Sequence, residues 1–308
     1  MAHKIKIAED RIKISGWMKK NYPSLGMAHL QKLCRIGEIR LNGSRAAATE
    51  AMVAGDELKI PPYLEEYKAA RTPHGYTADD AKDFARTAVY EDKDIIAVNK
   101  PAGISSQGGT GMEKHMDELA NFARPDLRGN ARLVHRLDKD TSGVLVIAKN
   151  YDAARAMGEL FKTREIKKTY LALAYGNLKA KEGTIRAPIL EGPDGPRVSE
   201  ARGAKRAVTK FKVMDEAFGK LSLVRLEPET GRMHQLRLHM AHIGHPIVGD
   251  FKYGRQGEFA RLKETLDIDR RLYLHAHSIE IPGKRKITAG MPEHMERICK
   301  FLNFGMKK

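Results

Sequence analysis

The chain has 308 residues, of which 42% are hydrophobic and 31% charged, and its formal net charge is +16 at pH 7. This length and apolar content are typical of a globular protein with two domains. The start of the chain lacks the apolar segment of a secretory signal, and no apolar run is long enough to span a bilayer. These features exclude an integral membrane protein, and we expect a cytoplasmic one.

The positive charge, with a pI near 9.7, points to a polyanionic partner. Phosphate backbones bind basic surfaces because condensed counterions are released. Nucleic acid is therefore the first partner class to consider, and an anionic membrane surface or simple solubility is the alternative. Aromatic residues make up only 6% of the chain, which does not indicate an extended surface for stacking bases.

Two cysteines are present, Cys34 and Cys299. Neither belongs to a CxxC pair or to a spacing typical of metal ligands. The sequence therefore predicts neither a disulfide nor a structural zinc site.

Residues 1–60 form the first predicted domain. Apolar residues recur at helical spacing over 11–22 and 27–35. The stretch GEIRLNGS predicts a strand that runs into an Asn-Gly turn, and residues 57–60 predict a further strand. Two helices, a hairpin and scattered basic side chains in this order resemble the small S4-type RNA-binding domain.

Residues 61–87 are polar and show no sustained periodicity, which predicts a linker. Residues 88–308 then form the second predicted domain. Its apolar patterns predict one hairpin, one helix and several strands, which are the hairpin over 89–98, the helix over 153–161 and the strands over 167–176, 207–213, 221–226 and 272–281. Because helices and strands do not alternate regularly, we expect an α+β domain with a mixed, largely antiparallel sheet.

A glycine-rich stretch, SSQGGTG, follows the predicted hairpin of the second domain. It matches neither of the glycine patterns that bind nucleotide phosphates. A nucleotide cofactor is therefore not indicated.

One acid lies among cations where the stretch VHRLDKDTSGVLVIAKN enters an apolar run. Asp138 lies between Arg136 and Lys139. Taken alone, such a carboxylate most simply caps a turn or pairs with a neighbouring base. The rest of the chain has to decide whether it does more.

The stretch TGRMHQLRLHMAHIGHPIVGD contains four histidines, at positions 234, 239, 242 and 245. Their spacings include no partnering thiol or carboxylate and do not form HExxH, so we predict no metal site. A helix that begins after Gly231 places Arg232, His234 and Arg237 near its first turns. There they can meet an acidic group or a phosphate.

Four stretches, NKPAG, HRLDKDTSG, KKTYLAL and GRMHQLRLH, occur in this order. Together they resemble the RluA-type pseudouridine synthases, particularly the large-subunit rRNA members that carry an N-terminal S4 domain. The resemblance covers nearly the whole chain. It implies isomerisation of uridine in RNA to its C-glycoside, on a catalytic domain with a long mixed sheet, and with neither a metal nor an organic cofactor.

The resemblance also implies roles for four side chains. Asp138 acts at the ribose, where it either attacks C1′ or takes the C2′ proton, and both routes stay open. Tyr170 packs on the flipped uracil and is placed to help remove the C5 proton. Arg237 is the expected partner of Asp138. Arg136 is associated with extruding the base from its stack.

Three alternatives remain beside this interpretation. The first is a tRNA pseudouridine synthase of the same family, and the second is a non-catalytic S4-type RNA-binding or ribosome-assembly protein. The latter has no need for an unpaired acid, since a carboxylate repels phosphate. The third is a glycoside hydrolase, which normally uses two facing carboxylates, whereas no second acid accompanies this motif.

We expect large-subunit rRNA as the substrate and a monomeric protein. Phosphate contacts position RNA without specifying its sequence. The stretches expected to read the target, residues 107–112 and 189–202, contain no decipherable code.

Overall fold

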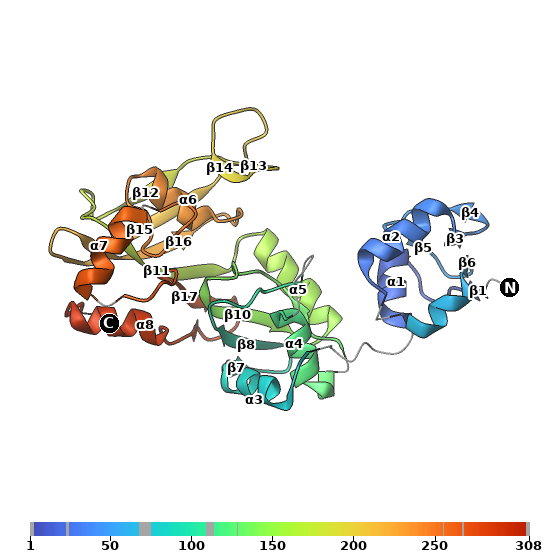
Figure 1. Ribbon diagram of the computed structural model, residues 1–308. Helices are drawn as coiled ribbons and strands as arrows, with labels where there is room; N and C mark the ends of the chain where they lie inside the picture. Colours follow the sequence, from blue (N-terminus) through green and yellow to red (C-terminus); the bar gives the residue numbers. More distant parts are fainter. Residues whose placement is uncertain are drawn as a thin grey trace. The chain divides into compact units, whose positions relative to one another are not determined.

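The computed structural model of this chain describes residues 3–22, 25–67, 75–108, 114–127, 129–254, 256–266 and 268–305. The chain divides into two compact units, Met1–His74 and Gly75–Lys308 (Figure 1). Part of the stretch expected to read the target, residues 109–112, lies outside the described residues. No helix within the described ranges is long and apolar enough to cross a membrane.

The first unit contains short strands, two α-helices and a 3-10 turn, which are β1 (His3–Lys6), β2 (Ile12–Lys13), α1 (Ile14–Asn21), α2 (Met27–Ile36), β3 (Arg40–Leu41), β4 (Ser44–Arg45), β5 (Ala51–Met52), β6 (Glu57–Ile60) and η1 (Pro62–Tyr67). Four of the strands form one sheet in the order β1-β6-β3-β4, and β2 pairs with β5. Both predicted helices and the strand over 57–60 are confirmed. The sequence did not predict β1.

Local signals in the sequence explain where the elements of the first unit end. Helix α2 stops at Gly37, which adopts a left-handed conformation with a φ of 79°, as glycine readily does. The predicted Asn-Gly turn is also present, because Asn42 and Gly43 have φ angles of 49° and 80° and join β3 to β4. Apolar side chains from both helices and β6 form the core of this unit.

The helical segments of the second unit are α3 (Ala78–Arg86), α4 (Met116–Ala123), η2 (Pro125–Leu127), α5 (Tyr151–Lys162), α6 (Gln235–His242), α7 (Gln256–Leu266) and α8 (Glu293–Phe301). Its strands are β7 (Ala88–Glu91), β8 (Ile95–Lys100), β9 (Arg132–Leu133), β10 (Ser142–Ala148), β11 (Lys167–Tyr175), β12 (Glu182–Arg186), β13 (Ile189–Gly192), β14 (Gly195–Val198), β15 (Val208–Ala217), β16 (Leu221–Pro228), β17 (Leu274–Glu280) and β18 (Ile287–Thr288). The hairpin, the helix and the four strands predicted for this part of the chain are confirmed.

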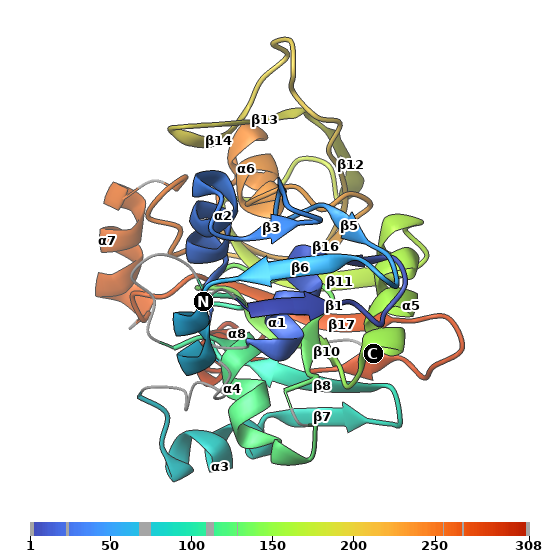
Figure 2. The same cartoon turned by 90° about the vertical axis from the view of Figure 1, so that its right-hand side faces the viewer.

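A 10-stranded sheet organises the second unit, with the main order β12-β15-β16-β11-β17-β10-β8-β7. Its pairs are antiparallel except for the parallel pair of β10 and β17, near the middle. In Figure 2 the strands β16, β11, β17, β10, β8 and β7 are labelled one below another in this order, and β13 and β14 form a separate hairpin above them. The predicted α+β class with a mixed, largely antiparallel sheet is thus confirmed.

Gly143 allows β10 and β17 to approach closely at this parallel pair. Its φ is +114°, and a Cβ atom there would lie 2.2 Å from the carbonyl oxygen of Ala276. A side chain at this position would force the two strands apart. The glycine of HRLDKDTSG therefore permits the close parallel pairing of β10 with β17.

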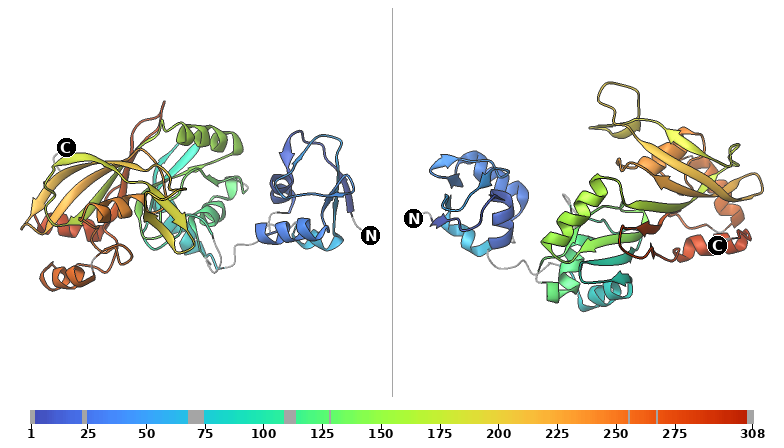
Figure 3. Two further views of the ribbon diagram at one scale, coloured as in Figure 1. Left: turned by 90° about the horizontal axis from the view of Figure 1, so that it is seen from above. Right: turned by 180° about the vertical axis from the view of Figure 1, so that it is seen from behind.

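Helices cover both faces of the sheet beside β10, and Figure 3 shows the sheet from above and from behind. Leu145 and Ile147 pack with apolar residues of α4 on one face. Val144 and Val146 pack with α5 on the other. This strand is buried on both faces, which explains its continuous apolar sequence.

The sequence predicts a linker over residues 61–87, whereas the structure has η1 and α3 inside this range. Helix α3 begins with a capping box in which the side chains and backbone amides of Thr77 and Asp80 bind each other. Its buried face contains Phe84 alone. Phe84 is the single large apolar residue of this helix, so the cap is its clearest local signal.

Candidate active site

Asp138 lies in the loop between β9 and β10, and the segment after β8 holds this loop by its backbone. The hydroxyl of Ser106 accepts a hydrogen bond from the amide of Leu137 (2.9 Å) and donates one to the carbonyl of Leu137 (2.7 Å). The amide of Gly103 donates to the carbonyl of Lys139 at 2.9 Å. The residues on both sides of Asp138 are therefore fixed, while 31% of its side chain stays exposed.

Lys100, in the NKPAG stretch, is fully buried and binds the same loop. Its ammonium group donates to the carbonyls of Pro101 (2.9 Å), Ile104 (2.8 Å) and Lys139 (3.0 Å). Burial lowers the pKa of Lys100 to about 8, against the opposing effect of two nearby carboxylates. A buried ammonium group is costly unless it is hydrogen-bonded. Its three bonds therefore connect the NKPAG turn firmly to the loop of Asp138.

His135 anchors the beginning of this loop. Its Nε2 accepts a hydrogen bond from the amide of Val146 at 2.9 Å, and its ring stacks on Phe161 with 4.9 Å between the centroids. Burial, together with the charge of Lys168, lowers the pKa of His135 to about 3. The imidazole is thus neutral, as an accepting Nε2 requires.

Arg237 binds a different carboxylate from the one that the sequence predicts. Its Nε and Nη2 donate to the two oxygens of Asp250, both at 2.7 Å, and both residues are buried. Burial acts to lower the pKa of Arg237, but the hydrogen bonds to Asp250 and the charge of Asp138 raise it. The predicted direct pair with Asp138 is therefore replaced by a pair with Asp250, and Asp138 acts on Arg237 through its charge.

The geometry of Asp250 explains this exchange of partners. Its Oδ1 also accepts hydrogen bonds from the amides of Lys252 and Tyr253, both at 3.0 Å. Asp250 is thus fixed in the turn after α6, where both oxygens meet the planar fork of Arg237. The more exposed Asp138 does not offer this two-bond geometry.

Among the described residues, His234 is the basic side chain that lies within 4 Å of the Asp138 carboxylate. Its Nε2 lies 3.9 Å from Oδ2 of Asp138. His234 is the N-cap residue of α6, which begins four residues after Gly231. The expectation that His234 meets an acidic group near the start of this helix is therefore confirmed, and the acid is Asp138.

Tyr170 lies on β11, directly opposite Leu226 of β16. Its side chain packs against two of the hydrophobic clusters of the second unit. Burial and the charge of Asp138 raise the pKa of Tyr170. The structure thus brings Tyr170 and Asp138 into one electrostatic environment, where the phenol keeps its proton at neutral pH.

Arg136 is exposed and makes no ion pair with any described residue. Its guanidinium is available to a molecule that approaches the loop. Of the four residues that the resemblance singles out, Arg136 and Asp138 lie in the same loop. The charge of Asp138 raises the pKa of Tyr170, and Arg237 binds Asp250.

The other histidines of the GRMHQLRLH region have structural contacts or face solvent. His239 bonds to Thr209 and the carbonyl of Ala187, and His245 donates to the carbonyl of Tyr175. His242 is exposed. The described residues contain no cluster of three histidine, cysteine or acidic side chains suited to a metal ion.

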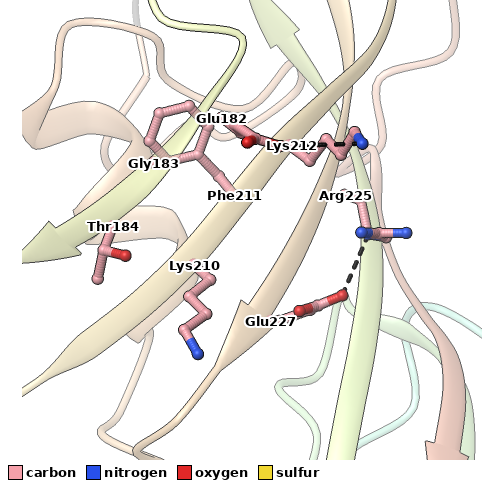
Figure 4. A pocket seen from close by; sticks show the side chains of 8 residues that line it. All are labelled: Glu182, Gly183, Thr184, Lys210, Phe211, Lys212, Arg225 and Glu227. Carbon is pink, nitrogen blue, oxygen red and sulfur yellow. Dashed lines mark ion pairs between the residues drawn. The ribbon is translucent and has the colours of Figure 1, made fainter.

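A separate groove over β12, β15 and β16 does not belong to the site of Asp138 (Figure 4). Tyr170, Leu226 and Phe211 are opposite one another in the sheet, so they share one face. Arg225 and Lys212 alternate with them and point to the other face. These two cations are already paired with acids of the groove, which are Glu227 at 3.1 Å and Glu182 at 3.8 Å.

Sequence reasoning missed four residues of the site, Lys100, Ser106, Asp250 and Tyr253. Lys100 belongs to a stretch that was used only to establish the resemblance. Asp250 ends the stretch with the four histidines, but no spacing rule connects it to Arg237. Contacts of this kind depend on how the chain folds back, so the sequence gives no local signal for them.

Comparisons with known proteins agree with this geometry. Residues 94–242 match the family described as RNA pseudouridylate synthase. The matched range includes Asp138, Tyr170, His234 and Arg237 and ends before Asp250.

Two bacterial relatives are both called "Ribosomal large subunit pseudouridine synthase C". The protein of Salmonella typhi is 33% identical over 300 residues, which cover 94% of this chain and 92% of the relative. That of Escherichia coli K12 is 34% identical over 295 residues, which cover 92% and 91%. The similarity therefore extends over both compact units.

Two solved human structures resemble the chain. "RNA Pseudouridylate Synthase Domain Containing 4" has a TM-score of 0.65 and 28% identity, and the match covers 74% of this chain and 97% of that one. "RNA Pseudouridylate Synthase Domain Containing 1" has a TM-score of 0.55 and 29% identity, with coverages of 67% and 83%.

Proposed function

This chain belongs to the RNA pseudouridylate synthase family, and from this premise we propose that it isomerises specific uridines of large-subunit ribosomal RNA to pseudouridine. The reaction breaks the bond between N1 and C1′, turns the uracil and joins C5 to C1′; C5 loses its proton and N1 takes one up. Substrate and product contain the same atoms, so the proposed reaction needs neither an oxidant nor a donated group.

The observation that carries the proposal is the setting of Asp138. Its neighbours are fixed by backbone hydrogen bonds, its carboxylate is partly exposed, and Tyr170 and His234 lie beside it. A carboxylate is ionised at neutral pH and can act as a nucleophile or a base. Asp138 accordingly attacks C1′ or takes the C2′ proton, and the structure is compatible with both routes.

The other site residues have complementary roles in this proposal. Tyr170 packs on the extruded uracil and helps to remove the C5 proton once Asp138 has reacted. Its raised pKa means that it is no base before the substrate is bound. Arg237 and Asp250 hold each other in place beside the site through two hydrogen bonds. Exposed Arg136 takes the place of the extruded base in the RNA stack.

The names of the relatives and the organisation of the chain support ribosomal RNA as the substrate. The relatives called large-subunit synthases are similar over both units. We infer that the first unit is an S4-like RNA-binding domain, since its helices α1 and α2 precede a hairpin as in that family. Exposed Arg35 and Arg45 flank a shallow groove on this unit. A monomeric, cytoplasmic protein completes the proposal.

The proposal is tested with purified protein on transcripts of large-subunit rRNA and of tRNA. Pseudouridine is quantified for the unaltered protein and for Asp138→Asn, which keeps the size of the side chain but removes its charge. We expect product in the rRNA transcript with the unaltered protein alone. Product confined to tRNA would identify the tRNA alternative, and RNA binding without product would identify a binding protein.

A further inference from the structure

His234 has an unusual backbone conformation for its position. Its φ and ψ are 53° and 23°, in the left-handed region, immediately before the first turn of α6. Residues other than glycine are uncommon in this region and cost free energy there. The conformation aims the imidazole away from the helix and toward the loop of Asp138.

One ring nitrogen of His234 is hydrogen-bonded, and the other faces a carboxylate. Nδ1 lies 2.7 Å from the hydroxyl of Tyr253, and Nε2 lies 3.9 Å from the carboxylate of Asp138. The rings of His234 and Tyr253 meet edge to face, with 5.6 Å between the centroids. The imidazole thus bridges a phenol and the proposed reactive carboxylate.

Tyr253 is itself held in place by charged neighbours. Its amide donates to Asp250, and the guanidinium of Arg237 and the ammonium of Lys252 lie 5.0 and 5.4 Å from the centre of its ring. These contacts fix the ring, and the ring fixes His234. Asp250 therefore supports both Arg237 and, through Tyr253, the imidazole.

The proton positions follow from these contacts. Burial raises the pKa of Tyr253, so its hydroxyl keeps its proton and is able to donate to Nδ1. Burial also lowers the pKa of His234, although Asp138 opposes this and Arg237, Lys252 and Asp250 act on the ring as well. We assign the hydrogen of the neutral imidazole to Nε2, which faces Asp138, and Nδ1 then accepts from Tyr253.

We propose that His234, fixed by Tyr253, is a positioning residue that orients the Asp138 carboxylate for reaction with the ribose. This inference rests on the proposed function. At 3.9 Å the Nε2–H group attracts one carboxylate oxygen through its dipole, without a hydrogen bond in the free protein, and leaves the other oxygen free to meet the substrate. A neutral donor orients the carboxylate without neutralising it, whereas an imidazolium ion paired with Asp138 makes it a weaker nucleophile and base.

The kinetic test uses His234→Gln, which keeps a donor near Asp138, and His234→Leu, which removes it. Exposed His242, on the same helix, provides the control His242→Gln. We expect His234→Leu to lower the single-turnover rate at saturating RNA by roughly 100-fold, as a misplaced reactive group does. His234→Gln recovers most of the rate, and both variants bind RNA with an affinity within about twofold of the unaltered protein.

The pH profile separates positioning from a structural role. The rate of the unaltered protein decreases as the pH falls below the ordinary histidine value of about 6.5, because His234 becomes charged. His234→Gln lacks this decrease, whereas His242→Gln keeps it. An unchanged rate in His234→Leu, or the same acid limb in His234→Gln, would overturn the inference.

A second measurement needs no turnover. Titration of the His234 imidazole by NMR, in the free protein and in Asp138→Asn, tests the contact directly. We expect its pKa to fall in Asp138→Asn, because the charge of Asp138 raises it. An unchanged titration would refute the contact whatever the activity. Conversely, a coupled titration in a protein that modifies no RNA would refute the proposed function and leave the contact standing.

Discussion

At the scale of single residues, backbone hydrogen bonds on both sides of Asp138 hold its position, and no described residue forms a hydrogen bond with its carboxylate. Hydrogen bonds fix the peptide groups of Leu137 and Lys139. The guanidinium of Arg237, which is affected by the charge of Asp138, is bound to Asp250. The carboxylate of Asp138 is consequently placed with accuracy and still free to react with a ligand.

Lys168 gives a prediction at this scale. It is partly buried on β11, two residues before Tyr170, and no described residue forms a hydrogen bond or ion pair with its ammonium group. Burial lowers its pKa. A buried, unpaired cation is costly, so we expect an RNA phosphate to be its partner. Lys168→Met should weaken RNA binding and reduce the slope of log affinity against log salt by about 1.

The neighbouring residue provides the control for this prediction. Lys167 is exposed on the same strand, and Lys167→Met should change affinity and salt slope less. Filter binding or fluorescence anisotropy over a range of salt concentrations gives both quantities. Equal effects of the two substitutions would remove the special role of Lys168.

What the sequence reveals about single residues depends on local context. Asp138 stands out because it is an acid between two cations shortly before a buried strand. Its partner could not be predicted in this way. Asp250 and Asp138 are both acids within reach of α6, and only the folded turn after α6 decides which of them receives the two bonds of Arg237.

At the scale of elements, hydrogen bonds of Lys100 hold the NKPAG turn and the HRLD loop together. Lys100 joins them through three carbonyls. Lys100→Met leaves these acceptors without their donor, and each buried unsatisfied group costs about 1–3 kcal/mol. We expect the free energy of unfolding to fall by roughly 2–4 kcal/mol in a urea titration. Lys139→Met, at an exposed position, should change it by less than about 0.5 kcal/mol, and a similar loss in both variants would contradict this account.

The junction of β10 with β17 gives a prediction for pH. His275 is fully buried, its Nε2 donates to the carbonyl of Ala289, and its Nδ1 accepts from the hydroxyl of Ser142 at 2.9 Å. Burial lowers its pKa from 6.5 to about 4. The neutral ring therefore stabilises the fold fully above pH 6.5, and this stabilisation is lost as the pH falls toward 4.

The size of this pH effect can be measured. One pKa unit corresponds to about 1.4 kcal/mol, so the lowered pKa of His275 is worth about 3 kcal/mol. His275→Gln should show a shallower decrease in the free energy of unfolding between pH 6.5 and 4 than the unaltered protein. The exposed control His242→Gln should follow the unaltered protein. A decrease in His275→Gln as steep as in the control would contradict the assignment.

The elements themselves were largely predictable because their patterns are local. Alternating and periodic apolar residues gave β11, β15, β16, β17 and α5. The order of strands was not, since the parallel contact of β10 with β17 joins residues far apart in the chain. Helix α3 was missed because its apolar face is made of alanines and one phenylalanine, and its capping box was not recognised.

At the scale of the whole molecule, a net charge of +16 is spread over two compact units. Arg35 and Arg45 are exposed on the first unit and make no ion pair with a described residue. Their double replacement by alanine should weaken RNA binding and reduce the salt slope by about 2. Turnover of saturating RNA should change little, because the proposed catalytic residues all belong to the second unit.

Two controls accompany this double variant. Lys82→Ala removes an exposed cation that is already paired with Asp79 and should leave the salt slope unchanged. Trp17, the single tryptophan, is buried in the first unit, so its fluorescence shows whether that unit remains folded. A folded double variant with unaltered affinity and salt slope would exclude this surface from RNA binding.

The central claim is that this chain modifies large-subunit rRNA through Asp138. The most direct test is a transcript-wide map of pseudouridine in cells that lack the gene, compared with the same cells expressing either the unaltered protein or Asp138→Asn. The account predicts that pseudouridine disappears at one or a few uridines of large-subunit rRNA and returns only with the unaltered protein. Loss confined to tRNA, or restoration by Asp138→Asn, would contradict it.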